Sequence, residues 1–272
     1  MPAVVQSSRM DSHEHVAFLA GSSNRIQVLR ELRERPGRGA ELARRCSLPR
    51  STIHRCLDGL TTRGWAKKGE GSYRLTTPGE LVLSAYEDLT ETVRVSADHE
   101  TLLTCLGEVG RTLPIEAMAS ATVIEATPEN PYATMEHSVD VFRSASFDRM
   151  RGIVPITSRS FNEAGRPLVE ANVDIEVVID ERVLEAARES HAEAHQFGRD
   201  SDNFDLFVRP EALSFGLAIL DDDRALVGAY DEGGNPRACL DGNDDVLIEW
   251  AIDTYERCRT AARRIEPAAG IG

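Results

Sequence analysis

The sequence has no long apolar run, no pairing pattern among its cysteines and almost no lysine. No stretch approaches the ~18 uninterrupted apolar residues of a membrane helix, and residues 1–15 show neither the basic segment nor the apolar core of a secretory signal. We therefore expect a cytoplasmic protein. The absence of a CxxC pair argues against a disulfide framework and a zinc ribbon. We interpret the five cysteines as small buried hydrophobes: Cys46, Cys56, Cys105, Cys239 and Cys258.

Lysine occurs only at Lys67 and Lys68, so arginine supplies nearly all of the 31 basic residues. Scarce lysine together with abundant aspartate and glutamate is typical of proteins adapted to high intracellular salt, in which carboxylates keep the surface hydrated. At about 1 M salt the Debye length falls to ~3 Å, so long-range attraction to a polyanion is nearly abolished. Any binding of nucleic acid would then depend on close contacts.

Positive charge is concentrated at the N-terminal end of an otherwise acidic chain. Residues 1–80 hold 14 Lys and Arg against 8 Asp and Glu, whereas residues 81–272 hold 17 against 37, and the overall charge is −14. A length of 272 residues with 41% hydrophobic residues is sufficient for two folded domains. The asymmetry predicts a nucleic-acid-binding domain joined to an acidic domain.

Three helices and a hairpin are predicted in the basic domain, which we assign to residues 1–80. Apolar residues recur at helical spacing in 24–34, 40–46 and 50–63. Residues 65–76 are predicted to form two short strands joined by a charged turn at 67–71. This order is that of a winged helix-turn-helix. Residues 20–85 resemble winged-helix repressors, because the Y-x-L-T-x-x-G signature that follows the wing is reproduced by Tyr73, Leu75, Thr76 and Gly79.

The third predicted helix is the candidate element for reading DNA. Its apolar residues share one face, which leaves polar side chains on the opposite face. An arginine near the start of a recognition helix can grip guanine O6 and N7. Arg55 is therefore our candidate for base readout, with His54 and Thr52 beside it. A solvated polar face on a purely structural helix is the alternative.

Several further residues of this domain are suited to contacts with the phosphates of double-stranded DNA. Ser51 and Thr52 can either cap the third helix or contact phosphate. Basic side chains of the wing and of the helix-turn-helix can bind phosphate without reading sequence, although a charged run is also often a solvated loop. These basic candidates are Arg45, Arg50, Lys67, Lys68 and Arg74.

Residues 81–106 carry apolar side chains at helical spacing, with a break expected near residues 96–98. Such a segment can link the domains or pair two subunits. Because one small winged helix rarely buries enough DNA surface for useful specificity, we predict a homodimer on a pseudo-palindromic site.

Residues 107–272 alternate between short apolar segments and helical segments, as is typical of an α/β domain. Strands are expected at 121–126, 139–145, 152–156, 173–180, 204–208, 213–220 and 224–230, and helices at 162–172, 181–195 and 244–264. The last two strands are expected to form a hairpin around the acidic turn at 221–223.

This succession resembles the C-terminal domain of archaeal winged-helix regulators of the FilR1 type, the methanogenesis regulators. The resemblance rests on the strand that ends in Pro155, the segment 173–179, the helix start at 180–183 and the strands that follow Leu213. It implies a transcription factor whose α/β domain senses a small molecule. The fold implied is distantly similar to phospholipase D and to the sugar-sensing domain of TrmB-type regulators.

Catalysis by a phospholipase D fold requires the H-x-K-x-x-x-x-D motif, and residues 107–272 contain no lysine. We therefore expect no enzymatic activity and a ligand cleft in place of an active site. Polar residues near strand ends are candidate contacts of a small polar metabolite, although each is also a common loop or capping residue. These candidates are Thr157, Ser158, Arg159, Asp180 and Tyr230.

The histidines His191 and His195 have the i,i+4 spacing of a two-histidine metal site but lack a third ligand on the same face. The same holds for His13 and His15, so we expect no metal and no cofactor. The regulator hypothesis has one alternative, a constitutive architectural protein that binds DNA and recruits a partner through its acidic domain. The two differ in whether that domain binds a small molecule.

Overall fold

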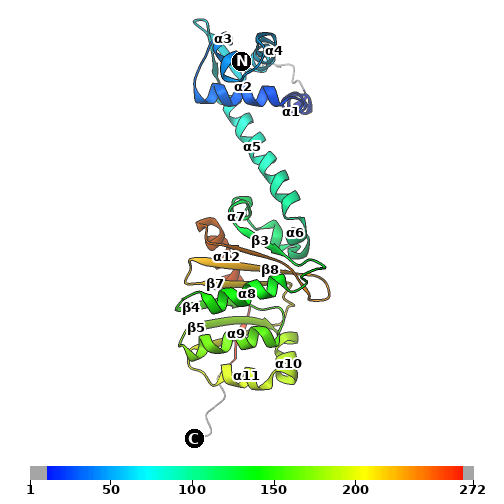
Figure 1. Ribbon diagram of the computed structural model, residues 1–272, viewed down its shortest axis with the longest axis vertical. Coiled ribbons are helices and arrows are strands. Elements are labelled where there is room, and N and C mark those ends of the chain that lie inside the picture. Colours follow the sequence, from blue (N-terminus) through cyan, green and yellow to red (C-terminus); the bar gives the residue numbers. More distant parts are fainter. Residues whose placement is uncertain (1–10, 266–272) are drawn as a thin grey trace, which may run out of the picture. The chain divides into compact units, whose positions relative to one another are not determined.

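The computed structural model describes residues 11–265 and divides into two compact units between Thr92 and Val93. The division lies inside the segment 81–106 that the sequence predicts as a linker. We describe each unit by itself and use the element labels of Figure 1. No helix within residues 11–265 is long and apolar enough to cross a membrane.

The first unit contains helices and one hairpin. Its elements are α1 (Ser12–Ala20), α2 (Ser23–Glu34), α3 (Gly39–Arg45), α4 (Arg50–Thr62), β1 (Ala66–Gly69), β2 (Ser72–Leu75) and the first part of α5 (Thr77–Asp98). The helices and strands α2 to β2 fall where the sequence predicts them. Helix α1 was not predicted, because only Leu19 of its nine residues is buried and its apolar pattern is correspondingly weak.

Positive φ angles mark the turns of this unit. Gly64 takes a φ of +72° just beyond the end of α4, which allows the chain to leave the helix. The hairpin turn consists of Glu70 and Gly71, both with positive φ, as a two-residue turn of this kind requires. Lys67 and Lys68 therefore lie on strand β1, which corrects their predicted place in the turn.

The Y-x-L-T-x-x-G signature has a direct structural reason. The hydroxyl of Thr76 donates to the carbonyl of Gly64 at 2.6 Å and accepts from the backbone N–H of Gly79 at 3.1 Å, which ties the hairpin to the start of α5. Gly79 packs against the backbone of Trp65 so closely that a Cβ would clash with the carbonyl oxygen of Trp65. Tyr73 is buried in the core of the unit.

The second unit is built on a mixed eight-stranded sheet in the described residues, with strand order β10-β6-β5-β4-β7-β8-β9-β3. The pairs β4–β5 and β5–β6 are parallel, and the other pairs are antiparallel. The strands are β3 (Thr122–Glu125), β4 (Arg149–Ile153), β5 (Asp174–Asp180), β6 (Phe204–Arg209), β7 (Phe215–Leu220), β8 (Arg224–Tyr230), β9 (Pro236–Gly242) and β10 (Arg263–Arg264).

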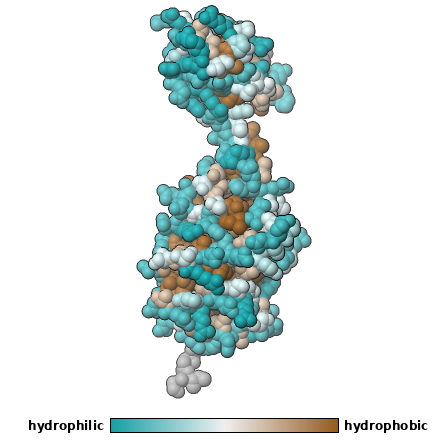
Figure 2. All heavy atoms as spheres, viewed as in Figure 1, coloured by the Kyte–Doolittle hydropathy of each residue, from teal (hydrophilic) through white to brown (hydrophobic). Residues whose placement is uncertain are grey.

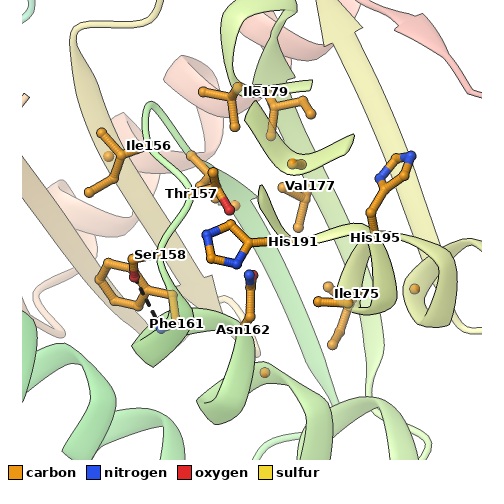
Figure 3. A pocket seen from close by; sticks show the side chains of 18 of the residues that line it. Ile156, Thr157, Ser158, Phe161, Asn162, Ile175, Val177, Ile179, His191 and His195 are labelled. Atoms are coloured by element: carbon orange, nitrogen blue, oxygen red, sulfur yellow. Dashed lines mark hydrogen bonds between the residues drawn. The ribbon is translucent and has the colours of Figure 1, made fainter. Parts of the chain in front are cut away.

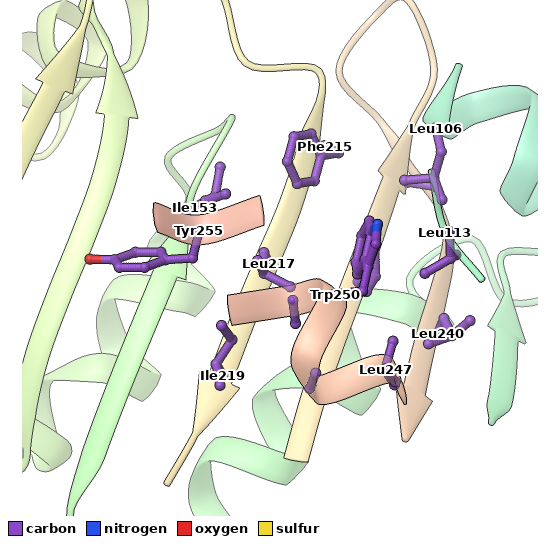
Figure 4. Packing of buried hydrophobic residues seen from close by; sticks show 14 of the residues in the cluster. Leu106, Leu113, Ile153, Phe215, Leu217, Ile219, Leu240, Leu247, Trp250 and Tyr255 are labelled. Carbon is purple, nitrogen blue, oxygen red and sulfur yellow. The ribbon is translucent and has the colours of Figure 1, made fainter. Parts of the chain in front are cut away.

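Helices cover both faces of this sheet. The remaining elements are α6 (Glu100–Leu106), the 3-10 turn η1 (Val109–Arg111), α7 (Ile115–Ser120), α8 (Ala133–Ser144), α9 (Arg159–Glu170), α10 (Glu181–Ser190), α11 (Ala192–Arg199) and α12 (Asp245–Thr260). Helices α6, α7 and α12 pack on one face, where Trp250 and Tyr255 of α12 meet Leu217 and Leu240 of the sheet (Figure 4). Helices α8 to α11 cover the other face (Figure 1).

Two expectations for this unit were wrong, and one strand was missed. Residues 139–145 belong to helix α8, because Thr134 and Val141 are buried at helical spacing across a longer segment than the alternating valines suggested. The predicted helix 181–195 is two helices, α10 and α11, interrupted at His191. Strand β9 was not predicted, since Pro236–Gly242 has few β-branched residues, yet it pairs along β8 and β3.

Candidate DNA interface and ligand cavity

Helix α4 presents a polar face to solvent because its apolar residues are buried on the opposite side. Ile53, Cys56, Leu57 and Leu60 are buried. On the other side Ser51, His54 and Arg55 are exposed and Thr52 is half-buried. Pro49 occupies the N-cap position, so neither Ser51 nor Thr52 caps the helix.

The basic residues of this region fall into two groups. Arg50 and Arg55 on α4, and Lys67 and Arg74 on the hairpin, are exposed, and within residues 11–265 none of them has an acidic partner. Arg45 differs, because its side chain is only 14% exposed and its Nε lies 3.3 Å from Glu31 Oε2. Its guanidinium also donates to the carbonyl of Arg35. Arg45 therefore fastens α3 to α2, and we leave it out of the interface.

The hairpin places two cations directly opposite each other. Lys67 pairs in register with Arg74, so the two side chains lie on the same face of the hairpin. Lys68 pairs with Tyr73 and lies on the other face, with its Nζ 5.6 Å from the centre of the Tyr73 ring. Like charges directly opposite in a strand pair destabilise it. An anion between Lys67 and Arg74 would remove this repulsion.

Two of the three arginines of α2, Arg30 and Arg33, are paired with a carboxylate within the unit. Arg30 Nε and Arg33 Nη1 each lie 2.7 Å from a carboxylate oxygen of Glu87 on α5. The hydrogen bond from Arg33, ahead of that from Arg30, lowers the pKa of Glu87 even though burial opposes this shift. Uncompensated positive charge is therefore left on α4 and on the hairpin.

The second unit contains a half-open cavity of about 780 Å³ between the sheet and helices α8 to α11. Its apolar walls come from both layers, as Ile175, Val177 and Ile179 of β5 and Phe161 of α9 illustrate (Figure 3). The space exists because small residues replace large ones on the sheet beneath it. These are Gly152 on β4, Gly216 and Ala218 on β7, and Gly228 on β8.

Tyr230 is held above two of these glycines. A Cβ at Gly216 would lie 3.0 Å from the Tyr230 hydroxyl, and one at Gly228 would lie 3.2 Å from Cε2 of the same ring. The ring therefore occupies space that only glycine leaves open. Burial raises the pKa of Tyr230, so its hydroxyl stays protonated. In the part of the chain that the structure describes, this hydroxyl has no hydrogen-bond partner.

Hydrogen-bonding side chains gather near the end of β4. Thr157, Asn162 and His191 line the cavity and are half-buried, and Figure 3 shows His191 directed toward the other two. Ser158 also lines it, but its hydroxyl accepts from the backbone N–H of Phe161 and caps α9. Burial raises the pKa of Cys239, a further lining residue, to about 12.

The candidate ligand residues from the sequence are only partly brought together. Thr157, Ser158, Arg159 and Tyr230 line the cavity, whereas Asp180 does not. The side chain of Arg159 is 85% exposed and lies 2.7 Å from Glu163, so it lies at the rim. Asn162, His191 and the glycines were not predicted. The glycines could have been found from the sequence because they lie inside strands. A glycine within a strand often marks a position where a ligand or another part of the backbone comes close.

Asp180 has a structural role, which corrects its assignment as a ligand contact. Its carboxylate accepts from the backbone N–H groups of Val183 and Leu213, both at 2.9 Å, and from Arg182. It is 1% exposed and caps α10. Burial alone would raise the pKa of Asp180, but the hydrogen bonds from Arg182, Leu213 and Val183 lower it.

The two histidine pairs acquire different surroundings. His191 and His195 both line the cavity. The ring of His15 on α1 packs edge-on to Trp65 at 5.7 Å, while His13 is exposed on the same helix. No group of three or more His, Cys, Asp or Glu side chains is arranged to hold a metal ion among residues 11–265.

Two family models match parts of the chain. Residues 131–261 match the model of the methanogenesis regulatory protein FilR1, middle domain, and residues 13–98 match the HVO_A0261 N-terminal domain. The first match covers the cavity and the second covers the helix-and-hairpin unit. A middle domain is matched, whereas the sequence interpretation referred to a C-terminal one. A comparison with curated proteins finds no match.

Solved structures with a similar arrangement are distant. TrmBL2, an archaeal chromatin protein, is 13% identical at a TM-score of 0.41, covering 93% of this chain and 100% of that one. A phospholipase D family member, NUC from Salmonella typhimurium, is 16% identical at a TM-score of 0.40, and the match covers 54% of this chain and 99% of that one. Scores this low carry no argument about function. The match of residues 131–261 to the FilR1 middle domain supports the interpretation of this chain as an archaeal regulator.

Proposed function

We propose that this protein is a cytoplasmic, homodimeric transcriptional regulator that binds double-stranded DNA through a winged helix and responds to a small molecule. The observation that carries the proposal is the placement of unpaired cations in the first unit. Arg50 and Arg55 lie on the exposed side of α4, and Lys67 faces Arg74 on the hairpin. The match of residues 13–98 and 131–261 to the two family models agrees with it.

Helix α4 acts as the recognition helix in this proposal. Arg55 reads a base in the major groove, and His54, Thr52 and Ser51 contribute neighbouring contacts. Lys67 and Arg74 bind one backbone phosphate between them, which adds affinity without sequence preference. Close contacts of this kind persist when salt screens long-range attraction.

The exposed face of α5 supports the homodimer. Leu81, Leu89 and Val93 are 68%, 56% and 61% exposed, and successive steps of eight and four residues place them on one side of the helix. Figure 2 shows apolar surface on this segment. A second α5 would cover it. Light scattering of the full chain should give a dimer, and Leu89→Glu should shift the protein toward monomer; a monomeric wild type would refute this part.

Ligand response is assigned to the cavity of the second unit, and no catalytic step is assigned to it, since residues 93–272 contain no lysine. A ligand that changes DNA affinity by the usual allosteric ~1 to 3 kcal/mol would serve as the effector. The coupling is reciprocal, so DNA must shift ligand affinity by the same factor.

The decisive experiment compares single substitutions on specific and scrambled duplexes. A genome-wide map of bound sites supplies the operator, and anisotropy titrations measure affinity. Arg55→Ala should cost about 1 to 3 kcal/mol on the operator and little on scrambled DNA. Lys67→Ala should weaken both duplexes alike. Arg111→Ala removes an exposed arginine of the second unit and should leave both unchanged.

Equal losses for Arg55→Ala on both duplexes would remove its role in base readout. DNA binding that no small molecule alters would favour the architectural alternative.

A further inference from the structure

We propose that the cavity of the second unit binds an uncharged, mainly apolar molecule that carries a hydrogen-bond acceptor for the Tyr230 hydroxyl. This departs from the small polar metabolite that the sequence suggested. The proposal deepens the regulatory function above and rests on it only for what the bound ligand does.

Charge is the first argument, because the interior of the cavity contains none. Five charged residues belong to its lining, and all are exposed: Arg159, Glu163, Arg166, Glu189 and Glu193. Arg159 bonds Glu163 at 2.7 Å, and Arg166 bonds Glu170 at 3.0 Å, so both cations of the lining are already paired. A phosphorylated or multiply charged metabolite would leave water without gaining a partner inside, which is costly.

The shape of the interior is the second argument. Aliphatic and aromatic side chains form most of the wall, and they belong to strands and helices on both sides of the space, among them Met150, Phe142, Leu206 and Phe197. A volume of about 780 Å³ is within the range of sites for small organic ligands. Apolar surface shows on the same face of the unit in Figure 2.

The Tyr230 hydroxyl is the third argument, because the half-buried Tyr230 lines the cavity and its hydroxyl has no hydrogen-bond partner within residues 11–265. A small number of polar groups on the wall of an apolar cavity fix the orientation of the ligand. Its ring cannot turn toward the sheet, since Gly216 and Gly228 already lie in contact with it. A carbonyl or ether oxygen of the ligand would satisfy the hydroxyl.

The position of Tyr230 fixes which end of the ligand is polar. Ile153 at the end of β4 pairs with Leu217, and Phe215 pairs with Ala229, the residue before Tyr230. The C-terminal end of β4 and the C-terminal end of β8 therefore lie at the same end of the sheet. Tyr230 is at this end, together with the segment that follows β4 and carries Thr157. The polar end of the ligand lies at this end of the strands, near Thr157, Asn162 and His191, and its apolar part lies along β5.

The test uses the full-length protein, the neutral fluorophore N-phenyl-1-naphthylamine as probe, and 2-decanone as a neutral competitor with one acceptor. Wild type should bind the probe with one site per chain and release it to 2-decanone. Glucose 6-phosphate and glutamate should not displace it.

Gly152→Val is the variant that fills the cavity. A Cβ at Gly152 meets no atom nearer than 3.6 Å, and valine suits a strand, so the fold should be retained. Probe affinity should fall at least tenfold. Gly69→Val, the same change on a strand of the first unit where a Cβ meets nothing within 4 Å, should leave it unchanged. Thermal unfolding verifies that both variants are folded.

Tyr230→Phe separates the hydrogen bond from the volume. It should weaken 2-decanone about fivefold, the worth of one ordinary hydrogen bond, while the probe, which has no acceptor of comparable strength, binds as before. Unchanged probe affinity in Gly152→Val, or displacement by the charged metabolites alone, would overturn the proposal. If 2-decanone binds in the cavity but DNA affinity does not respond, the ligand class stands and the regulatory role fails.

Discussion

The first unit carries its candidate function on its surface, whereas the second carries it in its interior. In the first unit, apolar side chains from α2, α3, α4 and the hairpin form one core, and unpaired cations remain outside. In the second unit, the layer between the sheet and α8 to α11 leaves a cavity whose charged residues are all at the rim. The candidate function rests on charges without partners in the first unit and on missing side-chain volume in the second.

The largest effect is expected where a glycine of the first unit is tightly packed. A glycine of the second unit with open space around it provides the comparison. Gly79→Val places a side chain against the carbonyl of Trp65 and 2.8 Å or less from Leu75 Cδ1. It should destabilise the first unit by about 3 kcal/mol or more and abolish DNA binding. Gly165→Ala, on α9, meets no atom within 4 Å and should stabilise by about 0.5 to 1 kcal/mol. Urea unfolding followed by circular dichroism measures both.

A smaller effect is expected from the buried carboxylate of the second unit. Asp180→Ala removes the cap of α10 and leaves the N–H of Leu213 without its acceptor, so it should cost about 2 kcal/mol. The folded-state pKa of Asp180 lies below its unfolded value. Its contribution is therefore complete above an unfolded pKa of about 3.9 and is lost as pH falls through the lower folded value.

Urea titrations of wild type and Asp180→Ala between pH 2 and pH 7 measure this contribution. The stability difference should shrink at the acid end of that range, and a difference that is independent of pH would contradict the assignment. In tryptophan fluorescence, Trp250 reports on the second unit, where it is buried against the sheet, and Trp65 reports on the first.

The smallest effect should have opposite signs for stability and for binding. Lys67→Glu places a carboxylate opposite Arg74, so it should stabilise the first unit by about 0.2 to 1 kcal/mol. The same change should weaken binding to any DNA, because a phosphate contact becomes a repulsion. Lys68→Glu makes the same change of charge opposite Tyr73 and should bring no stabilisation. If both variants shift the melting temperature alike, the cross-strand repulsion is not the cause.

The sequence predicted helices α2, α3 and α4 and the hairpin of the first unit because their signals are local, whereas it missed α1. Apolar spacing over about a dozen residues and turns at Pro49, Gly64 and Gly71 suffice to place them. Helix α8 was mistaken for a strand because its two valines alternate within seven residues, while its helical spacing is visible only over twelve. The predicted break near residues 96–98 lies close to the observed interruption at His99.

The candidate site of the second unit was harder to predict because it depends on what is missing. Gly152, Gly216 and Gly228 come from three strands, and no local pattern tells that they lie beneath one space. Asp180 was chosen for its place at a strand end, yet that position also begins a helix, where a carboxylate serves the backbone. The exposure of a surface residue such as Arg55 can be predicted from its position in the helical repeat alone. The residues that line a cavity can be predicted only when the pairing of the strands is known.

The surroundings of Gly152 make the size of the cavity adjustable at one position of one strand. Because a Cβ there meets only ordinary van der Waals contacts, alanine would reduce the volume without moving the backbone of β4. Gly216 and Gly228 lack this freedom, since any side chain there displaces Tyr230. A substitution at residue 152 can thus change the length of ligand that fits, while the hydrogen-bonding end of the cavity stays the same. The size of the ligand and its chemistry are therefore set by different residues.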